Sequence, residues 1–198
     1  YPVGAHVQLS DGRMARIVAK LNAIVSPDVI AALYEASQAG VEIDLIVRGI
    51  CCLRPALPGV SDRIRVRSII GRFLEHSRLF YFANGGAEEY YTGSADWMPR
   101  NLERRVEVIV PVEDRGLQLR MFSLLETCLA DNRQAWELGP DGTYVQVVPG
   151  HEDELATHRK LLRDPWGLDR IDSRYTTAEV RAVTALAVAP VAQAMPAN

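Results

Sequence analysis

A histidine and an arginine stand two residues apart in a run rich in aromatic residues. Residues 73–82 are predicted to form a strand, so the side chains of His76 and Arg78 leave the same face. An imidazole beside a guanidinium can act as a proton donor, a covalent phosphate carrier or a hydrogen-bond donor to phosphate. The alternative is a half-buried strand histidine without chemistry, and spacing alone does not decide between the two.

A second arginine marks the end of a strongly apolar run. Residues 41–47 are predicted to form a strand, and Arg48 follows it directly. A charge there is costly unless it emerges at the carboxyl-terminal edge of the sheet, where α/β proteins bind ligands. Arg48 is therefore a candidate phosphate ligand; the alternative is a surface arginine that caps the strand.

Two further arginines alternate with apolar residues, so Arg65 and Arg67 share one face of a predicted strand. With Arg72 and Arg78 they form a group of guanidinium side chains that suits a polyanion. The alternative is a solvated face of the sheet on which these arginines pair with nearby acids.

A small, polar segment follows the next predicted strand. Its residues Ser94 and Asp96 stand where backbone N–H groups could approach a phosphate closely. Asp96 is expected to orient His76 or Arg48, or else to cap the following turn. The residues expected to add to or neutralise a basic wall here are Arg100, Arg104, Arg105, Glu103 and Glu107.

The composition narrows the class of protein. Of 198 residues 48% are hydrophobic and 24% charged, enough for a packed core, and the net charge of −3 argues against a general nucleic-acid-binding protein. Three cysteines do not make a disulfide framework and indicate a reducing cytosol. The sequence has no apolar run long enough to span a membrane, no Walker A loop and no Cys/His spacing typical of zinc, so no metal ligands are predicted.

The predicted elements form an α/β fold. Residues 15–21 and 41–47 read as strands, and residues 26–40 as the helix between them, with Ser26 and Pro27 at its start. The two strands should be parallel, with a right-handed crossover. Further strands are predicted at residues 64–70, 73–82, 89–92, 105–111 and 144–148, with a hairpin turn at 84–86 and a second long helix at 114–130.

The chain divides into three predicted parts. Residues 1–12 read as an irregular start, residues 13–150 as the α/β domain and residues 151–198 as a helical extension. Helices are predicted within the extension at residues 151–163 and 176–188.

Several motifs in one order resemble a known family. From about Arg13 to about Val148 the chain is similar to the second C-terminal catalytic domain of bacterial polyphosphate kinase. The resemblance implies a phospholipase D-like mixed β-sheet flanked by helices. The segments that carry it are residues 20–22, 33–40, 43–53, 64–70, 72–78, 93–101 and 105–108.

The resemblance also implies an activity. The family enzyme transfers the γ-phosphate of ATP reversibly to polyphosphate through a phosphohistidine, in a cleft between two related domains that each supply a histidine. Arg48 and His76 would contact the nucleotide phosphates, with His76 as the catalytic residue, and Arg65, Arg67, Arg78, Ser94 and Asp96 would bind nucleotide or phosphate. Mg²⁺ and the phosphorylated histidine would belong to the preceding catalytic domain. A cytoplasmic homo-oligomer, peripheral at the inner membrane, is expected.

The sequence also departs from the wider phospholipase D pattern. Arg78 stands where that pattern has a lysine, and Ala83 where it has an aspartate. The chain is expected to hold half of the cleft and to be inactive or weakly active alone, with the missing domain or a homologous chain as its partner. Two alternatives stay open: a phospholipase D-like phosphodiesterase made by two copies that each supply His76, or a non-enzymatic polyphosphate-binding or nucleotide-binding module.

Overall fold

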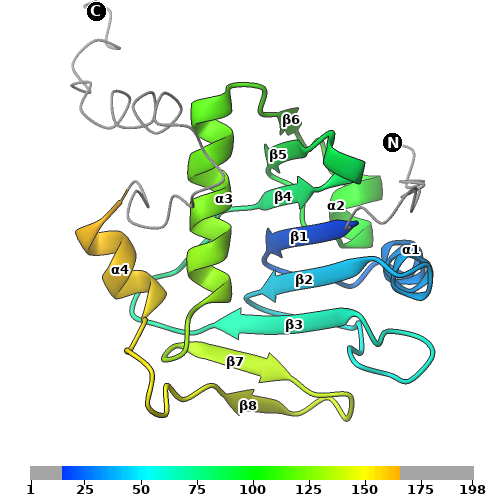
Figure 1. The fold of residues 1–198 in the computed structure, drawn as a ribbon. Coiled ribbons are helices and arrows are strands. Elements are labelled where there is room, and N and C mark those ends of the chain that lie inside the picture. Colours follow the sequence, from blue (N-terminus) through cyan, green and yellow to red (C-terminus); the bar gives the residue numbers. More distant parts are fainter. Residues whose placement is uncertain (1–14, 166–198) are drawn as a thin grey trace, which may run out of the picture.

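A mixed sheet organises residues 15–165, the part of the chain that the computed structural model describes (Figure 1). Within these residues the strand order is β6-β5-β4-β1-β2-β3-β7-β8. The strands are β1 (Arg16–Leu21), β2 (Glu42–Val47), β3 (Ile64–Ile69), β4 (Leu79–Phe82), β5 (Glu89–Gly93), β6 (Ile109–Pro111), β7 (Ala135–Leu138) and β8 (Tyr144–Gln146). The predicted α/β fold, a mixed sheet flanked by helices, is confirmed.

The predicted strand–helix–strand unit lies at the centre of the sheet. Helix α1 (Pro27–Gln38) connects β1 to β2, which pair in parallel from Arg16↔Glu42 to Leu21↔Val47. β3 joins β2 in parallel, and the outer strands are antiparallel to their neighbours. Three neighbouring parallel strands therefore direct their carboxyl ends to one edge of the sheet.

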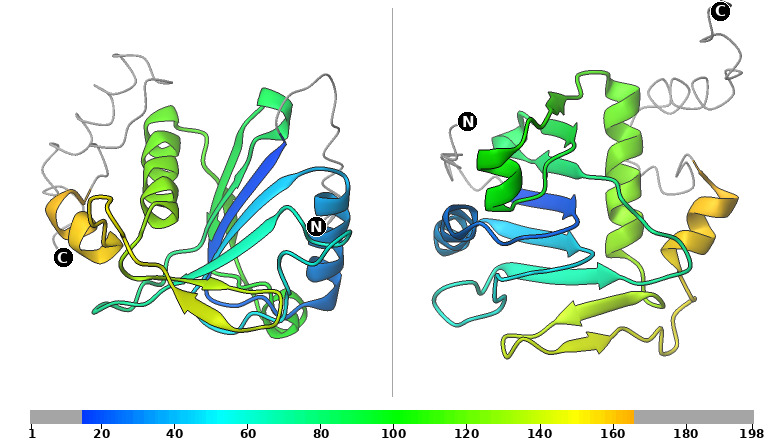
Figure 2. Two further views of the ribbon diagram at one scale, coloured as in Figure 1. Left: turned by 60° about the horizontal axis from the view of Figure 1, so that its bottom comes forward. Right: turned by 180° about the vertical axis from the view of Figure 1, so that it is seen from behind.

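Successive residues of the central strands point to opposite faces of the sheet and pack there in two separate hydrophobic cores. Helix α1 covers one face and α3 (Arg115–Leu129) the other (Figure 2). Leu45 packs in the core beside α1, whereas Ile46 packs with Phe122 and Leu125 of α3. α3 confirms the helix predicted over residues 114–130, and its apolar residue Leu117 is exposed.

Three strands of the structure, β4, β6 and β7, differ from the prediction. The strand expected over residues 73–82 begins only at Leu79, because β1 ends one residue after its pair Lys20↔Leu79 and offers no further partner. β6 likewise covers only the end of the predicted strand 105–111, since β5 ends opposite Ile109. Strand β7 was not predicted.

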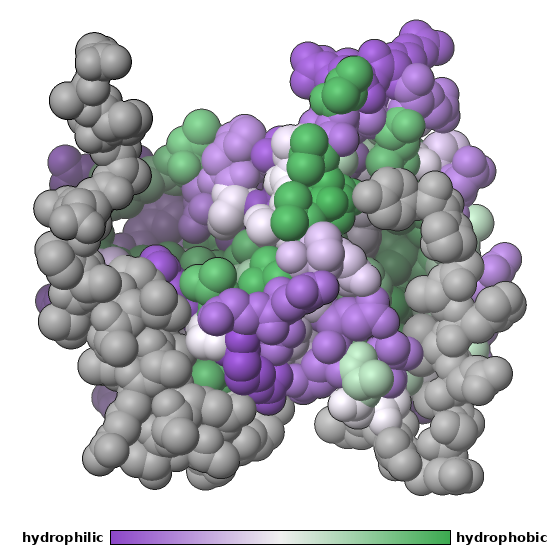
Figure 3. Space-filling view, turned by 90° about the horizontal axis from the view of Figure 1, so that it is seen from above, coloured by the Kyte–Doolittle hydropathy of each residue, from purple (hydrophilic) through white to green (hydrophobic). Residues whose placement is uncertain are grey.

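Short helices complete the described residues. α2 (Pro99–Arg104) follows β5, and α4 (Thr157–Arg163) is shorter than the helix predicted over residues 151–163. The predicted helix 176–188 and the irregular start 1–12 lie outside the described residues. No helix of the described part is long and apolar enough to span a membrane. Seen from the β6 side, apolar surface alternates with strongly polar surface (Figure 3).

One buried carboxylate joins α3, β7 and α4. Asp131, 1% exposed, accepts hydrogen bonds from the backbone N–H groups of Arg133, Gln134 and Ala135 at 2.5 to 3.0 Å. It also accepts one from the N–H of Thr157 at 2.7 Å. Residues on both sides of the expected boundary at residue 150 are thus in direct contact, although the division itself stays a prediction.

Asp131→Ala should lower the free energy of unfolding by about 3 kcal/mol, because four backbone N–H groups, two of them buried, lose their acceptor. Urea unfolding followed by circular dichroism measures the change. Asp141→Ala is the matched control, since Asp141 accepts its hydrogen bonds from Thr143 at the surface. Equal losses in the two variants would contradict the role assigned to Asp131.

Candidate functional site

A polar pocket of about 480 Å³ lies beyond the carboxyl ends of β1 and β2. Asn22 follows β1 and Arg48 follows β2, so the topology of the sheet brings these two side chains to the same edge. The pocket is lined by Asn22, Arg48, His76, Arg78, Ser94, Asp96, Arg100, Asn101, Arg105 and Glu107. Four of these residues are arginines and two are carboxylates, so the lining carries a positive excess.

The carboxylate of Asp96 organises this pocket. Its two oxygens accept hydrogen bonds from Nε and Nη2 of Arg78, each at 2.9 Å, in a bidentate pair. Oδ1 also accepts from the backbone N–H of Asn22 at 2.8 Å and from its Nδ2 at 3.2 Å. Burial raises the pKa of Asp96, but the hydrogen bonds from Arg78 and Asn22 outweigh it and leave the pKa below its usual range.

The side chain of Asn22 connects Asp96 to Arg48. Its side-chain oxygen accepts a hydrogen bond from Nε of Arg48 at 2.9 Å, while its amide nitrogen donates to Asp96. A continuous series of hydrogen bonds thus runs from Arg48 through Asn22 and Asp96 to Arg78. The two guanidinium groups are held in place by one carboxylate and one amide.

Arg78, at the other end of this series of hydrogen bonds, also contacts His76. Nη1 of Arg78 lies 3.2 Å from Nδ1 of His76 and 3.4 Å from its backbone oxygen. Because a guanidinium group only donates, Nδ1 accepts and the proton of the neutral ring belongs on Nε2. Nε2–H is then the ring group that can donate to a ligand.

An acidic residue lies opposite the arginines. Glu107 accepts hydrogen bonds from the hydroxyl of Ser94 and, at 2.6 Å, from Nδ2 of Asn101. These two hydrogen bonds, the Ser94 bond foremost, hold the pKa of Glu107 below its usual range. The carboxylate is therefore ionised at neutral pH and partly offsets the charge of Arg105.

The structure brings together five of the seven predicted site residues: Arg48, His76, Arg78, Ser94 and Asp96. His76 and Arg78 meet through a loop before β4 and not on a strand, as had been expected. Among the residues expected to form the basic wall, Arg100, Arg105 and Glu107 line the pocket, whereas Glu103 and Arg104 do not.

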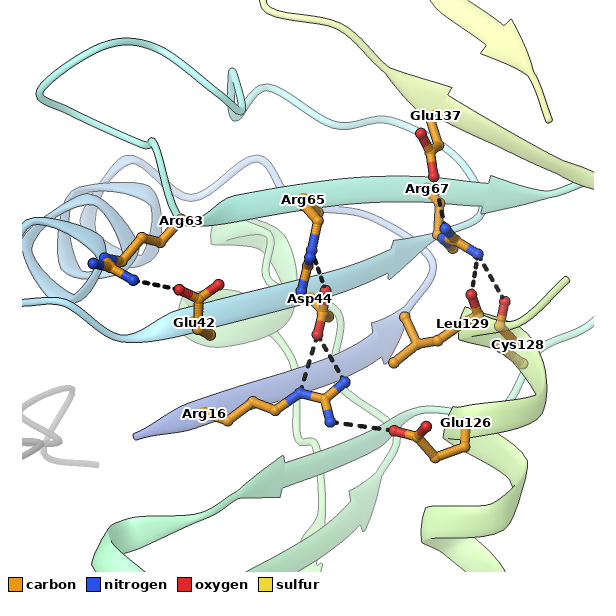
Figure 4. Close-up of polar contacts among 10 residues, drawn as sticks. All are labelled: Arg16, Glu42, Asp44, Arg63, Arg65, Arg67, Glu126, Cys128, Leu129 and Glu137. Atoms are coloured by element: carbon orange, nitrogen blue, oxygen red, sulfur yellow. Dashed lines mark hydrogen bonds and ion pairs between the residues drawn. The ribbon is translucent and has the colours of Figure 1, made fainter. Parts of the chain in front are cut away.

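Arg65 and Arg67 lie elsewhere, beside α3 (Figure 4). Nε of Arg65 donates to Asp44 at 2.8 Å, and Arg67 donates to Glu137 at 2.7 Å and to the carbonyl of Leu129 at the end of α3. These two side chains leave the middle of β3 and pair within the sheet, away from its carboxyl-terminal edge. They do not join the pocket, and the phosphate-binding role predicted for them gains no support from their position.

Two pocket residues were not predicted as part of the site. Both are buried: Asn22 connects Arg48 to Asp96, and Asn101 donates a hydrogen bond to Glu107. Asn22 carries the same signal as Arg48, a polar side chain directly after a buried strand, and could have been found by it. Asn101 has no such signal, because its place depends on how α2 packs against the sheet.

The described residues do not form a metal site. None of their His, Cys, Asp and Glu side chains gather in a group of three or more that could hold a metal ion. The two carboxylates of the pocket already accept hydrogen bonds from Arg78 and Asn22, and from Ser94 and Asn101. This donor set does not fit Mg²⁺, which prefers free carboxylate and water oxygens.

Arginines and a histidine thus gather at the carboxyl edge of the mixed sheet of this α/β domain. Residues 5–158 match the family model described as polyphosphate kinase C-terminal domain 2. The chain belongs to the polyphosphate kinase family, and the mixed sheet flanked by helices that was expected for that family is confirmed.

Individual relatives agree with this assignment. A polyphosphate kinase of Thermosynechococcus vestitus is 67% identical over 153 residues, which cover 77% of this chain and 21% of the relative. That of Pseudomonas putida is 56% identical, with the same two shares. The crystal structure of polyphosphate kinase from Porphyromonas gingivalis matches with a TM-score of 0.75 and 41% identity, over 79% of this chain and 24% of that one. The chain thus spans about a fifth of the length of these curated relatives.

Asp96→Asn should lower the free energy of unfolding by about 3 kcal/mol, because Arg78 then keeps a nearly buried charge without its carboxylate. Chemical unfolding measures the loss. Glu137→Gln is the control: it breaks the pair of Arg67 with a carboxylate that is largely exposed, and should cost less than about 1 kcal/mol. A loss in Asp96→Asn no larger than in this control would show that Asp96 does not organise the pocket.

Acid should weaken the fold through the same carboxylate. The folded-state pKa of Asp96 lies below its value in the unfolded chain, so its contribution to stability is full above the unfolded pKa of about 4 and is lost as the pH falls through the folded pKa. The free energy of unfolding, measured between pH 5 and pH 3, should therefore fall more steeply in the parent protein than in Asp96→Asn. Identical slopes would contradict this account.

Proposed function

We propose that this pocket binds the phosphate groups of ATP and polyphosphate during reversible transfer of the γ-phosphate of ATP to polyphosphate. The observation that carries the proposal is the convergence of Arg48, Arg78, Arg100 and Arg105 with His76 on one cavity. In phosphoryl transfer a protein contributes mainly by positioning the reacting groups and stabilising their charge. Fixed positive charges and hydrogen-bond donors are therefore its main requirement.

Each part of the series of hydrogen bonds then has a role. Asn22 holds the guanidinium group of Arg48, and Asp96 holds that of Arg78. Because both side chains are already fixed, less conformational entropy is lost when phosphate binds. His76 is the catalytic residue of this pocket: its Nε2–H donates to an oxygen of the moving phosphoryl group and stabilises the charge that develops there. The covalent phosphohistidine of the family reaction is assigned to the preceding catalytic domain, as is Mg²⁺.

The pocket is then one wall of the complete cleft. It holds one histidine among its lining residues, and transfer through a phosphohistidine with a second, stabilising histidine needs two. By itself this domain should bind phosphate chains and nucleotide but turn over little or not at all. The expected homo-oligomer and cytoplasmic location stay predictions.

Titration calorimetry of the chain with ATP, ADP and long-chain polyphosphate tests the proposal. Arg48→Ala and His76→Ala should each weaken binding by about 10- to 100-fold, because each removes a hydrogen bond to a charged oxygen. Affinity should fall as salt is raised, as ion-pair contacts require.

Arg63→Ala is the matched control. Arg63 pairs with Glu42 on an exposed surface and does not line the pocket, so its removal should leave affinity unchanged. Failure of all three ligands to bind the parent chain, or equal loss in the control, would refute the proposal for this pocket.

A further inference from the structure

A lysine lies buried under the loop that carries the catalytic histidine. Lys20 of β1 is 4% exposed, and its neighbour on the same face of the strand, Val18, packs in the core beneath α3. The Nζ atom of Lys20 donates to the backbone oxygen of Ser77 at 3.2 Å and lies 3.5 Å from Oε1 of Glu75. These two partners stand on either side of His76 in the chain.

Stability alone does not account for a lysine at this position. Removing an ammonium group from water costs several kcal/mol, and an apolar side chain of similar volume is often neutral or stabilising in place of a buried ion pair. Methionine would fill the same space in the core. The charge therefore needs a reason other than packing, and the loop that it contacts supplies one.

In the loop between β3 and β4, His76 contacts Arg78 and lies inside a turn formed by its two neighbours. Glu75 accepts hydrogen bonds from the N–H of Ser77 at 3.1 Å and from its hydroxyl at 2.8 Å, which closes a tight turn around His76. Burial raises the pKa of Glu75, but the charge of Lys20 and the hydrogen bonds from Ser77 outweigh it and lower the pKa overall, so Glu75 is ionised at neutral pH. Lys20 meets both ends of this turn.

We propose that Lys20 is a positioning residue for His76: it fixes the turn formed by Glu75 and Ser77 and thereby sets the place of the imidazole in the pocket. Lys20 does not itself line the pocket, so it acts only through these two residues. The inference rests on the proposed function in that His76 is taken as the catalytic residue.

Two measurements on Lys20→Met test this. In NMR spectra of the carbon-labelled chain, the Cε1–Hε1 signal of His76, assigned by its loss in His76→Ala, should move because the turn is released. The affinity for long-chain polyphosphate in calorimetry should fall about tenfold, as expected for a group displaced by a fraction of an ångström or more. The thermal unfolding midpoint should not fall, which separates positioning from a structural role.

Lys160→Met is the matched control, because Lys160 is the only other lysine in the sequence. It pairs with Asp164 at the end of α4 and lines a different cavity. Neither the His76 signal nor the polyphosphate affinity should change in this variant.

A second variant, Glu75→Gln, removes the negative charge of the Lys20–Glu75 pair. It should move the His76 signal in the same way, and it decides the question if Lys20→Met does not fold. An unmoved His76 signal in a folded variant overturns the proposal, as does an unchanged affinity where the parent chain binds polyphosphate. If the parent chain binds no polyphosphate, the proposed function fails, but the NMR measurement still tests the positioning.

Discussion

The site depends on one nearly buried carboxylate, that of Asp96. Three segments that are distant in the sequence meet there: the end of β1 through Asn22, the loop before β4 through Arg78, and the residues after β5. A carboxylate can accept several hydrogen bonds at once, and here they hold two arginines and, through Arg78, the imidazole of His76. Without that acceptor the pocket would keep four arginines and only one carboxylate, that of Glu107.

The chain uses its arginines in two ways. Those at the carboxyl edge of the sheet surround a cavity with few acids, whereas Arg65 and Arg67 on β3 meet Asp44, Glu137 and the carbonyl oxygens that end α3. Arg65 and Arg67 pair with carboxylates of the sheet and with carbonyl oxygens that the end of α3 leaves unpaired, which is a structural role. Position relative to the strand ends, and not residue type, separates the arginines that line the pocket from those that pair within the fold.

The sequence predicted well what depends on local patterns. The strand–helix–strand unit followed from apolar runs and a Ser-Pro helix start, and the hairpin between β4 and β5 from Asn84-Gly85-Gly86. Prediction was poorer for the loop around His76, where an aromatic run was mistaken for strand. A strand needs a neighbour, and β1 ends before it could pair with those residues.

The sequence by itself therefore determined the fold class, the family and most of the pocket, because the residue types and their order along the strands are written in it. Tertiary structure alone decided which arginines converge, since Arg48 and Arg65 were both predicted to bind phosphate and only the folded sheet separates the pocket at its edge from the face on which Arg65 pairs with Asp44. It also decided the tautomer inferred for His76 and the burial of Lys20 beneath it. Those depend on contacts between residues far apart in the chain, and local propensity holds no information about such contacts.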